Sequence, residues 1–243
     1  MITVACVYWK GVFRGRESVY SGEWVAKLKN MVARNLPMPH RFVCLSNVPV
    51  SCERIHLLND WRGWWSKIEL FRPGLFDGDR VLYLDLDTIV LKDLTPIVKY
   101  PSKFAIMGQP IPRNNYTVKM HPAEGRLTVY HYQSSVFVFD GGMGTELYTD
   151  FNDFKMQVFR GDQDYISAKC SAITLFRGDQ DYIGNTLPDL DILPRKWMGK
   201  LDRVTNAGPP KDMIIGLCMK NKGFRKKNID FAKQYKWFEE IWQ

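Results

Sequence analysis

An apolar run that ends in two acidic residues constrains this chain more than any other feature. Residues 80–84 read Arg-Val-Leu-Tyr-Leu, which is typical of a buried strand, and Asp85 and Asp87 follow at once. In open α/β sheets, ligands bind beyond the carboxyl ends of the strands. If the chain stays extended, alternation points both carboxylates to the same side. We therefore expect a ligand site at the end of this strand.

The rest of the pattern predicts an α/β fold with an open, largely parallel sheet. Short apolar runs predict further strands at 2–9, 41–46, 53–58, 104–107 and 134–139. Apolar residues at helical spacing predict helices at 19–35, 64–71, 145–158 and, as a final amphipathic turn or two, 237–242. Strands alternating with helices favour a parallel sheet. With no linker in sight, we expect residues 1–243 to form a single domain, and the polar stretch between 107 and 134 to be a loop over the site.

The chain is basic, with a formal net charge of +8. This balance favours anionic partners, namely nucleic acid, an anionic membrane surface or a phosphorylated small molecule. The densest basic run lies within 220–227, where a solvated surface is the simpler interpretation. A nucleic-acid-binding or nucleotidyl-transferring protein is an alternative, but the sequence has neither a recognised nucleic-acid module nor a P-loop, so no nucleic acid is expected.

The cysteines and the apolar runs predict a location. Five cysteines are an odd number, and none has CxxC spacing, which fits a reducing compartment and argues against a disulfide framework or structural zinc. The apolar run at 2–9 is too short for a signal peptide, and no stretch approaches the roughly 20 apolar residues of a membrane span. We expect a cytoplasmic protein whose basic face suits peripheral contact with the inner face of a membrane.

Two carboxylates one residue apart can hold a hard divalent cation through oxygen. Such a cation bridges a diphosphate and neutralises the charge that develops as a nucleotide leaves. Asp85 and Asp87 are therefore the candidate metal ligands. The alternative is that they cap the following turn or pair with a nearby Lys or Arg. Their apolar flanks, Leu-Tyr-Leu before and Thr-Ile-Val after, make the pattern more specific than a bare DxD.

Segment 80–91 resembles the hallmark strand of the glycosyltransferase family 8-like group, which reads close to VLYLDxDTxV. The resemblance is closest to bacterial and phage-type members that carry Gly-Trp-Trp-Ser-Lys upstream, here residues 63–67. Further matching segments follow in the family's order: 39–45, 133–140, 178–181 and 193–197. The resemblance implies a GT-A fold, which is Rossmann-like, and a hexosyltransferase-like enzyme. It also implies a nucleotide-sugar donor, UDP-linked, with Mn²⁺ or Mg²⁺, and an unknown glycan, lipid or protein acceptor such as a cell-surface glycan.

The resemblance also assigns donor contacts to individual residues. It implies that Val7 and Tyr8, at the end of the first strand, touch the base, and that Lys67 reaches the diphosphate or the sugar. A cation there would stabilise the leaving diphosphate, in the region that Asp85 also serves. Trp65 is expected in the pocket wall, with Trp64 beside it. Core packing remains open for Tyr8 and the tryptophans, and a helix-surface position remains open for Lys67.

Two later segments carry the remaining implied contacts. Gln133 and Ser134 stand where the family has Asn-Ser-Gly at the donor sugar, although strand-end capping also suits them. The segment Phe-Arg-Gly-Asp-Gln-Asp-Tyr-Ile occurs twice, at 159–166 and 176–183. We assign the second copy to the site, while Asp162 and Asp164 of the first stay open. A carboxylate near the anomeric carbon can deprotonate an acceptor hydroxyl or stabilise ring charge. The implied catalytic residues are Asp179, Gln180 and Asp181.

One departure from the family lies near the C-terminus. Members commonly have a histidine there that completes the metal shell, but residues 212–223 contain none. Cys218, Asn221 or water would have to substitute, while Lys220 is placed to face the diphosphate. The missing histidine supports an alternative function, a catalytically impaired nucleotide-sugar or glycan-binding protein on the same fold.

Overall fold

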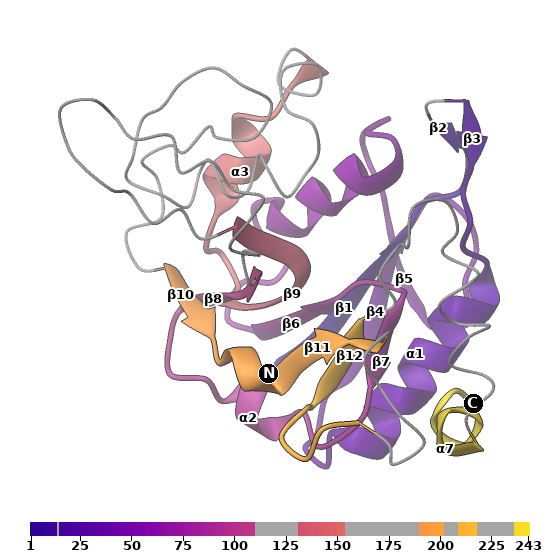
Figure 1. The fold of residues 1–243 in the computed structure, drawn as a ribbon. Coiled ribbons are helices and arrows are strands. Elements are labelled where there is room, and N and C mark those ends of the chain that lie inside the picture. The colour runs from indigo at the N-terminus through magenta and orange to yellow at the C-terminus, as the bar shows by residue number, and fades with distance from the viewer. Residues whose placement is uncertain (14, 110–130, 154–189, 202–208, 218–235) are drawn as a thin grey trace, which may run out of the picture.

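The computed structural model describes residues 1–13, 15–109, 131–153, 190–201, 209–217 and 236–243 around a seven-stranded sheet (Figure 1). In spatial order the strands are β10 (Leu190–Leu193), β8 (Phe104–Gln109), β9 (His131–Asp140), β6 (Arg80–Leu84), β1 (Ile2–Tyr8), β4 (Arg41–Ser46) and β5 (Glu53–His56). All pairings are parallel except those of β9, which runs antiparallel to both β6 and β8. The predicted α/β fold with a mostly parallel sheet is confirmed.

Helices, a second sheet and a hairpin accompany the central sheet. The helices are α1 (Gly22–Asn35), the 3-10 helix η1 (Gly63–Phe71), α2 (Thr95–Val98), α3 (Thr145–Thr149), the 3-10 turn η2 (Arg195–Trp197) and α7 (Lys236–Ile241). A second sheet contains β11 (Met198–Lys200), β12 (Ile215–Leu217) and β7 (Thr88–Val90), and a hairpin contains β2 (Val12–Phe13) and β3 (Arg16–Glu17). No helix in the described ranges is long and apolar enough to cross a bilayer.

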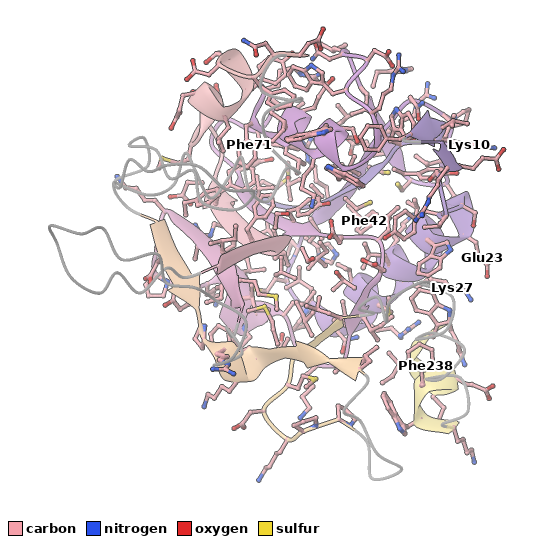
Figure 2. The ribbon with its side chains drawn as sticks, turned by 45° about the horizontal axis from the view of Figure 1, so that its top comes forward. Lys10, Glu23, Lys27, Phe42, Phe71 and Phe238 are labelled. Atoms are coloured by element: carbon pink, nitrogen blue, oxygen red, sulfur yellow. The ribbon has the colours of Figure 1, made fainter. Side chains whose placement is uncertain are left out.

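The central sheet carries a hydrophobic core on each face. Alternating side chains of the central strand β6 point to opposite sides, as the period of two requires. Leu82 and Leu84 join the core under α1, whereas Val81 and Tyr83 join the core under η1. Each fully buried aliphatic side chain of this kind contributes about 1.5–3 kcal/mol to folding. Figure 2 labels one phenylalanine from each core, Phe42 on the α1 side and Phe71 on the η1 side.

Helix α1 buries one stripe of side chains and is covered on its outer side by α7 (Figure 1). The buried residues are Val25, Leu28, Met31 and Val32, at helical spacing. Figure 2 shows Phe238 of α7 near α1, whose Glu23 and Lys27 form an i,i+4 ion pair of 3.0 Å. The guanidinium of Arg34 donates to the carbonyl of Ile241 at 2.5 Å, which ties the two helices together.

Several predicted boundaries are wrong by a few residues. Helix α1 begins at Gly22 rather than at residue 19, and β9 extends the predicted strand at both ends. The helix expected over 145–158 ends at Thr149, because the chain leaves the helical path to bury Phe151 against Trp61 and Trp65 at ring distances of 4.8 and 5.1 Å. Residues 154–158 lie outside the described ranges. So do residues 110–130 of the loop expected between 107 and 134, whose two ends belong to β8 and β9.

The cysteines that can be placed are free thiols. Cys6 and Cys44 are fully buried as register partners on β1 and β4, and Cys52 is partly exposed. They behave as small core residues, as expected for free cysteine. Cys170 and Cys218 lie outside the described ranges.

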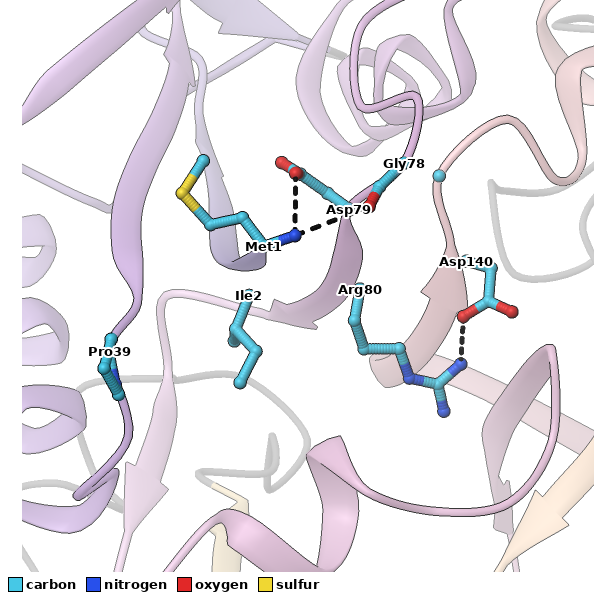
Figure 3. A pocket seen from close by; sticks show the side chains of 8 residues that line it. Met1, Ile2, Pro39, Gly78, Asp79, Arg80 and Asp140 are labelled. Carbon is cyan, nitrogen blue, oxygen red and sulfur yellow. Dashed lines mark hydrogen bonds and ion pairs between the residues drawn. The ribbon is translucent and has the colours of Figure 1, made fainter.

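Arg80 fixes the start of β6 by using several of its donors at once. Its guanidinium donates to the carbonyls of Val98, Tyr100 and Ser102 at 2.7–3.0 Å and to Asp140 at 2.8 Å. Beside it, a pocket of about 660 Å³ opens between the starts of β1 and β6 and the end of β9 (Figure 3). This pocket lies at the amino ends of the parallel strands, the edge opposite Asp85, and its Arg80–Asp140 pair already serves the fold.

Gly141, at the same edge of the sheet, packs closely against the backbone of Phe76. A Cβ at this position would lie 1.6 Å from the carbonyl oxygen of Phe76. We expect Gly141→Ala to lower the free energy of unfolding by about 3 kcal/mol, because the overlap forces the backbone apart. Gly22→Ala is the matched control, since nothing lies within 4 Å of its Cβ. Urea unfolding of both variants measures this, and equal stabilities would contradict the packing described.

Candidate functional site

The candidate site begins where β6 leaves the central sheet. The strand ends at Leu84, and the amide of Thr88 donates to the carbonyl of Asp85 at 3.0 Å, so residues 85–87 form a turn. The expectation that Asp85 and Asp87 lie on one extended strand is therefore wrong. The chain must turn here because β7, which starts at Thr88, pairs with β12 in the second sheet. Asp85 and Asp87 sit at the carboxyl end of β6, as predicted.

Asp85 is joined to a buried lysine from another element. The ammonium of Lys67, in η1, lies 3.0 Å from Oδ1 of Asp85. The same ammonium donates to the carbonyl oxygen of Ser134 at 3.0 Å and to its hydroxyl at 3.1 Å. The side chain of Lys67 is only 7% exposed, and that of Asp85 is 25% exposed. Three of the predicted site residues are thus brought together, and the helix-surface interpretation of Lys67 is wrong.

Tyr83 completes the surroundings of Asp85. Its hydroxyl donates to Oδ1 of Asp85 at 2.5 Å, and the ammonium of Lys67 lies 5.2 Å from the centre of its ring. Burial alone raises the pKa of the Asp85 carboxyl. The charge of Lys67, with hydrogen bonds from Tyr83, Lys67 and Ser135, outweighs burial and holds that pKa below its usual value. Asp85 is therefore ionised at neutral pH, as a metal ligand must be.

Asp87 is held from the other side of the sheet. The hydroxyl of Tyr20 donates to Oδ2 of Asp87 at 2.9 Å. Tyr20 precedes α1 and packs against the core on the α1 face, whereas Lys67 belongs to the η1 face. Both Tyr20 and Asp87 are half-buried. The two carboxylates thus take partners from opposite layers.

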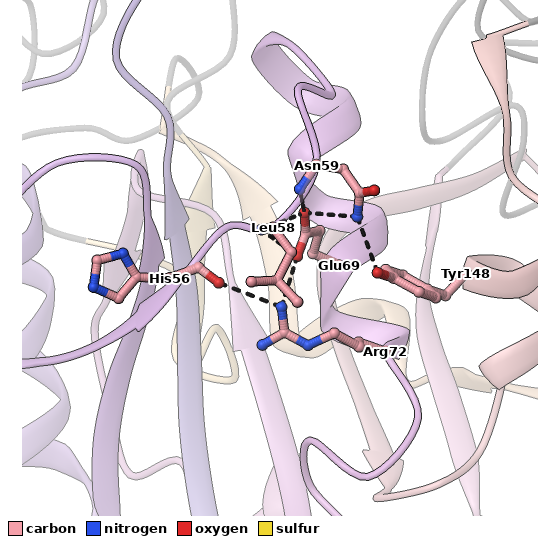
Figure 4. Close-up of polar contacts among 6 residues, drawn as sticks. All are labelled: His56, Leu58, Asn59, Glu69, Arg72 and Tyr148. Carbon is pink, nitrogen blue, oxygen red and sulfur yellow. Dashed lines mark hydrogen bonds and ion pairs between the residues drawn. The ribbon is translucent and has the colours of Figure 1, made fainter.

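Helix η1 is itself anchored by a fully buried carboxylate, two residues after Lys67 (Figure 4). Glu69 accepts hydrogen bonds from the amides of Leu58 and Asn59, the closest at 2.6 Å, and from the side chain of Asn59 at 3.0 Å. Arg72 supplies the countercharge at 2.9 Å. A buried carboxylate is tolerated only when it is satisfied in this way. The network fixes η1 against the segment that follows β5, and therefore fixes Lys67.

The remaining predicted donor contacts are placed as follows. Tyr8 is 4% exposed and belongs to the core on the α1 face, which fits the core-packing interpretation left open from the sequence. Val7 is half-buried and packs on the η1 face. Trp65 is fully buried against Phe151, again as core. Its indole nitrogen has no hydrogen-bond partner among the residues described.

Other candidates cannot be brought into this geometry. Gln133 lies in β9 opposite Met107, at the same end of the strand as Ser134. Lys220, both copies of the repeat and the implied catalytic residues Asp179, Gln180 and Asp181 lie outside the described ranges. These assignments stay predictions.

The donor set at the turn fits a hard divalent cation. Asp85 and Asp87 offer carboxylate oxygens, the ligands that Mn²⁺ and Mg²⁺ prefer, and both are partly exposed. Next to them, the hydroxyl of Thr88 is buried with no hydrogen-bond partner in the described part of the chain. No group of three His, Cys, Asp or Glu that could hold a metal occurs within that part. The pairing of Asp85 with lysine, which the sequence left open as an alternative, is also realised.

The residues that sequence reasoning missed are the two tyrosines. Tyr83 had a usable signal, because it stands two positions before Asp85 on a strand and so shares its side of the sheet. Tyr20 had none, since 67 positions separate it from Asp87 and no motif marks it.

Solved structures similar to this chain include glycosyltransferases. The galactosyltransferase LgtC, crystallised with donor and acceptor sugar analogs, aligns over 97% of this chain and 96% of its own, with a TM-score of 0.50 and 12% identity. GlyE of Streptococcus pneumoniae TIGR4 gives a TM-score of 0.56 at 12% identity, with 99% of this chain and 63% of GlyE covered. The bifunctional WbbM gives 0.52 at 13%, with 99% and 51% covered.

At such identities the likeness shows the fold. The expected GT-A glycosyltransferase fold is therefore confirmed, while membership of family 8 stays a prediction. No protein-family model matches the sequence, and no curated protein matches it.

The Lys67–Asp85 pair should contribute measurably to the stability of the fold. We expect Lys67→Met to cost about 3 kcal/mol of unfolding free energy at pH 7.5, because it leaves a largely buried carboxylate without its cation. In the parent, the lowered pKa of Asp85 makes a stabilising contribution above about pH 4, which is lost on further acidification. In the variant only the hydrogen bonds from Tyr83 and Ser135 still oppose burial, so we expect the pKa of Asp85 to rise, and part of the deficit to disappear between pH 7.5 and pH 5.

Urea unfolding at both pH values measures these effects. Lys67→Met/Asp85→Asn should be more stable at pH 7.5 than Lys67→Met alone, because the orphaned charge is gone. Lys29→Met, at an exposed position of α1, is the matched control. If Lys67→Met is no less stable than Lys29→Met, the pair does not stabilise the fold.

Proposed function

We propose that this protein is a metal-dependent glycosyltransferase that transfers a sugar from a nucleotide-sugar, UDP-linked, to an acceptor. The cation is Mn²⁺ or Mg²⁺, held by Asp85 and Asp87. The acceptor is a glycan, or a lipid or protein, as the resemblance to family 8-like enzymes implies. LgtC was crystallised with donor and acceptor sugar analogs, which supports a sugar acceptor.

One observation carries this proposal. Lys67 pairs with Asp85 at the carboxyl end of the central strand β6, and Asp87 follows in the same turn, in a fold that solved glycosyltransferases share. This is the edge where ligands of open α/β sheets bind. Charges of both signs suit a ligand that brings a cation and a diphosphate together.

Each residue has a distinct part in the proposed reaction. The metal, when bound, neutralises charge on the diphosphate as the nucleotide leaves. Asp85 and Asp87 would hold it through oxygen, and Lys67 and Tyr83 help to hold the pKa of Asp85 below its usual value. Lys67 adds a fixed ammonium beside the metal ligand, where it can stabilise developing negative charge without reorganisation. Ser134, which accepts from Lys67, orients that ammonium.

Calorimetric titration with UDP tests the proposed donor site. We expect UDP to bind at least tenfold more tightly with Mn²⁺ than without it, and the difference to vanish in Asp85→Ala/Asp87→Ala. Asp60→Ala/Asp212→Ala is the matched control, because both side chains are exposed, at 75% and 65%. Mn²⁺ titrated alone should bind more weakly than with UDP, because the ammonium of Lys67 opposes a bare dication until a diphosphate offsets it.

The outcomes separate the parts of the proposal. Equal UDP binding with and without Mn²⁺ would remove the metal from the mechanism. Absence of UDP binding in the parent would remove the UDP donor, and the other nucleoside diphosphates would then be titrated in the same way.

A second candidate is a nucleotide-sugar or glycan-binding protein with impaired catalysis. Residues 212–223 lack the family's histidine, and the described ranges hold no group of three His, Cys, Asp or Glu that could bind a metal. Release of UDP from a panel of UDP-sugars with Mn²⁺ discriminates the two. Donor binding without release, with or without simple sugar acceptors, would favour the impaired protein.

A further inference from the structure

We infer that Tyr20 is a positioning residue of the metal site, which holds the carboxylate of Asp87 in its ligating orientation. The inference rests on the proposed function, because it assigns Tyr20 a part in metal binding. Nothing in the sequence marks Tyr20, so the contact in the structure carries the argument.

The contact is a directed hydrogen bond. The phenol of Tyr20 donates to Oδ2 of Asp87 at 2.9 Å, with both residues half-buried. A donor on one oxygen fixes the rotation of the carboxylate plane, and so fixes the direction of the other oxygen. Hydrogen bonds from outer residues orient metal-ligating carboxylates in this way and affect metal affinity by about 10–100-fold.

A row of edge-to-face aromatic rings holds the phenol in place. Tyr20 packs edge-on against Trp24 of α1 at 5.3 Å, and Trp24 packs edge-on against Trp242 at 5.1 Å. Lys27 lies over the ring of Trp242 at 5.1 Å, and Trp242 is only 8% exposed. Aromatic pairs of this geometry contribute about 0.5–1.5 kcal/mol each beyond burial. The segment after α7 therefore supports Tyr20 from behind and makes its hydroxyl a rigid donor.

The two carboxylates have partners of different charge, a lysine for Asp85 and a tyrosine for Asp87. Lys67 gives Asp85 a countercharge, whereas the phenol of Tyr20 is a neutral donor to Asp87. A neutral donor orients a ligand without competing electrostatically with the cation. Loss of the phenol should therefore weaken metal binding while leaving metal-free nucleotide binding unchanged.

Tyr20→Phe tests the inference, because it removes one hydroxyl and keeps the edge-on contact of the ring with Trp24. We expect the UDP affinity measured with Mn²⁺ to fall about tenfold, and the affinity without Mn²⁺ to stay the same. Tyr100→Phe is the matched control, since its hydroxyl also bonds a carboxylate, that of Asp191, which belongs to neither the site nor the Glu69 network. Adding Tyr20→Phe to Asp87→Ala should cause no further loss, because the two residues act as one unit.

The results distinguish this inference from the proposed function. If the parent binds UDP with Mn²⁺ dependence and Tyr20→Phe matches it, the positioning role is overturned and the proposed function stands. An equal loss in Tyr100→Phe, or an equal loss without Mn²⁺, would show a general structural effect and also overturn it. A parent without metal-dependent binding overturns both.

Discussion

The buried ion pair between Lys67 and Asp85 is the constraint on which the site depends. An ammonium with 7% exposure is costly unless a countercharge and acceptors surround it, and Asp85 and Ser134 provide both. These residues come from η1, the end of β6 and β9. The pair therefore requires three separate segments to meet. Removing one partner would leave the other as a largely buried charge without a counterion. The same charges that complicate burial also suit a ligand made of a dication and a diphosphate.

The topology explains why these segments meet. Strand β9 runs antiparallel to β6, so its first residues, rather than its last, reach the carboxyl edge, where the carbonyl of Ser135 accepts from the amide of Asp85 at 2.9 Å. A parallel β9 would deliver its far end, Asp140, to this edge. At the same point the chain leaves one sheet for another, because β7 pairs with β12. The turn at 85–87 thus lies between the layers, open to partners from η1 and from the segment before α1.

Local patterns in the sequence predicted much of this arrangement. Strands β4 and β6 were predicted to the residue, because a run of apolar residues specifies a buried strand by itself. Asp85 and Asp87 were placed at the correct edge for the same reason, although the turn that they form was not predicted. Tyr20 and the Glu69 network could not be predicted, because contacts across 67 or 11 positions depend on tertiary packing that no period records. The burial of Lys67 is a similar case: helical spacing indicates which face is apolar, yet only β9 shows that a charged group is satisfied there.

Glu69 and Lys67 show how one helix can carry two buried charges of opposite sign. Glu69 points to the segment after β5, where two backbone amides and the side chain of Asn59 donate hydrogen bonds to it and Arg72 balances its charge. Its polar contacts are therefore satisfied without any residue of the site. Lys67 points to the turn, where its partners are the residues that would bind a ligand. Rigidity on the first side is what permits charge on the second, because an ammonium on a loosely held helix would turn to water instead of to Asp85. The Glu69 network, remote from the turn, is therefore part of the reason that the turn can present ionised oxygens in a fixed place.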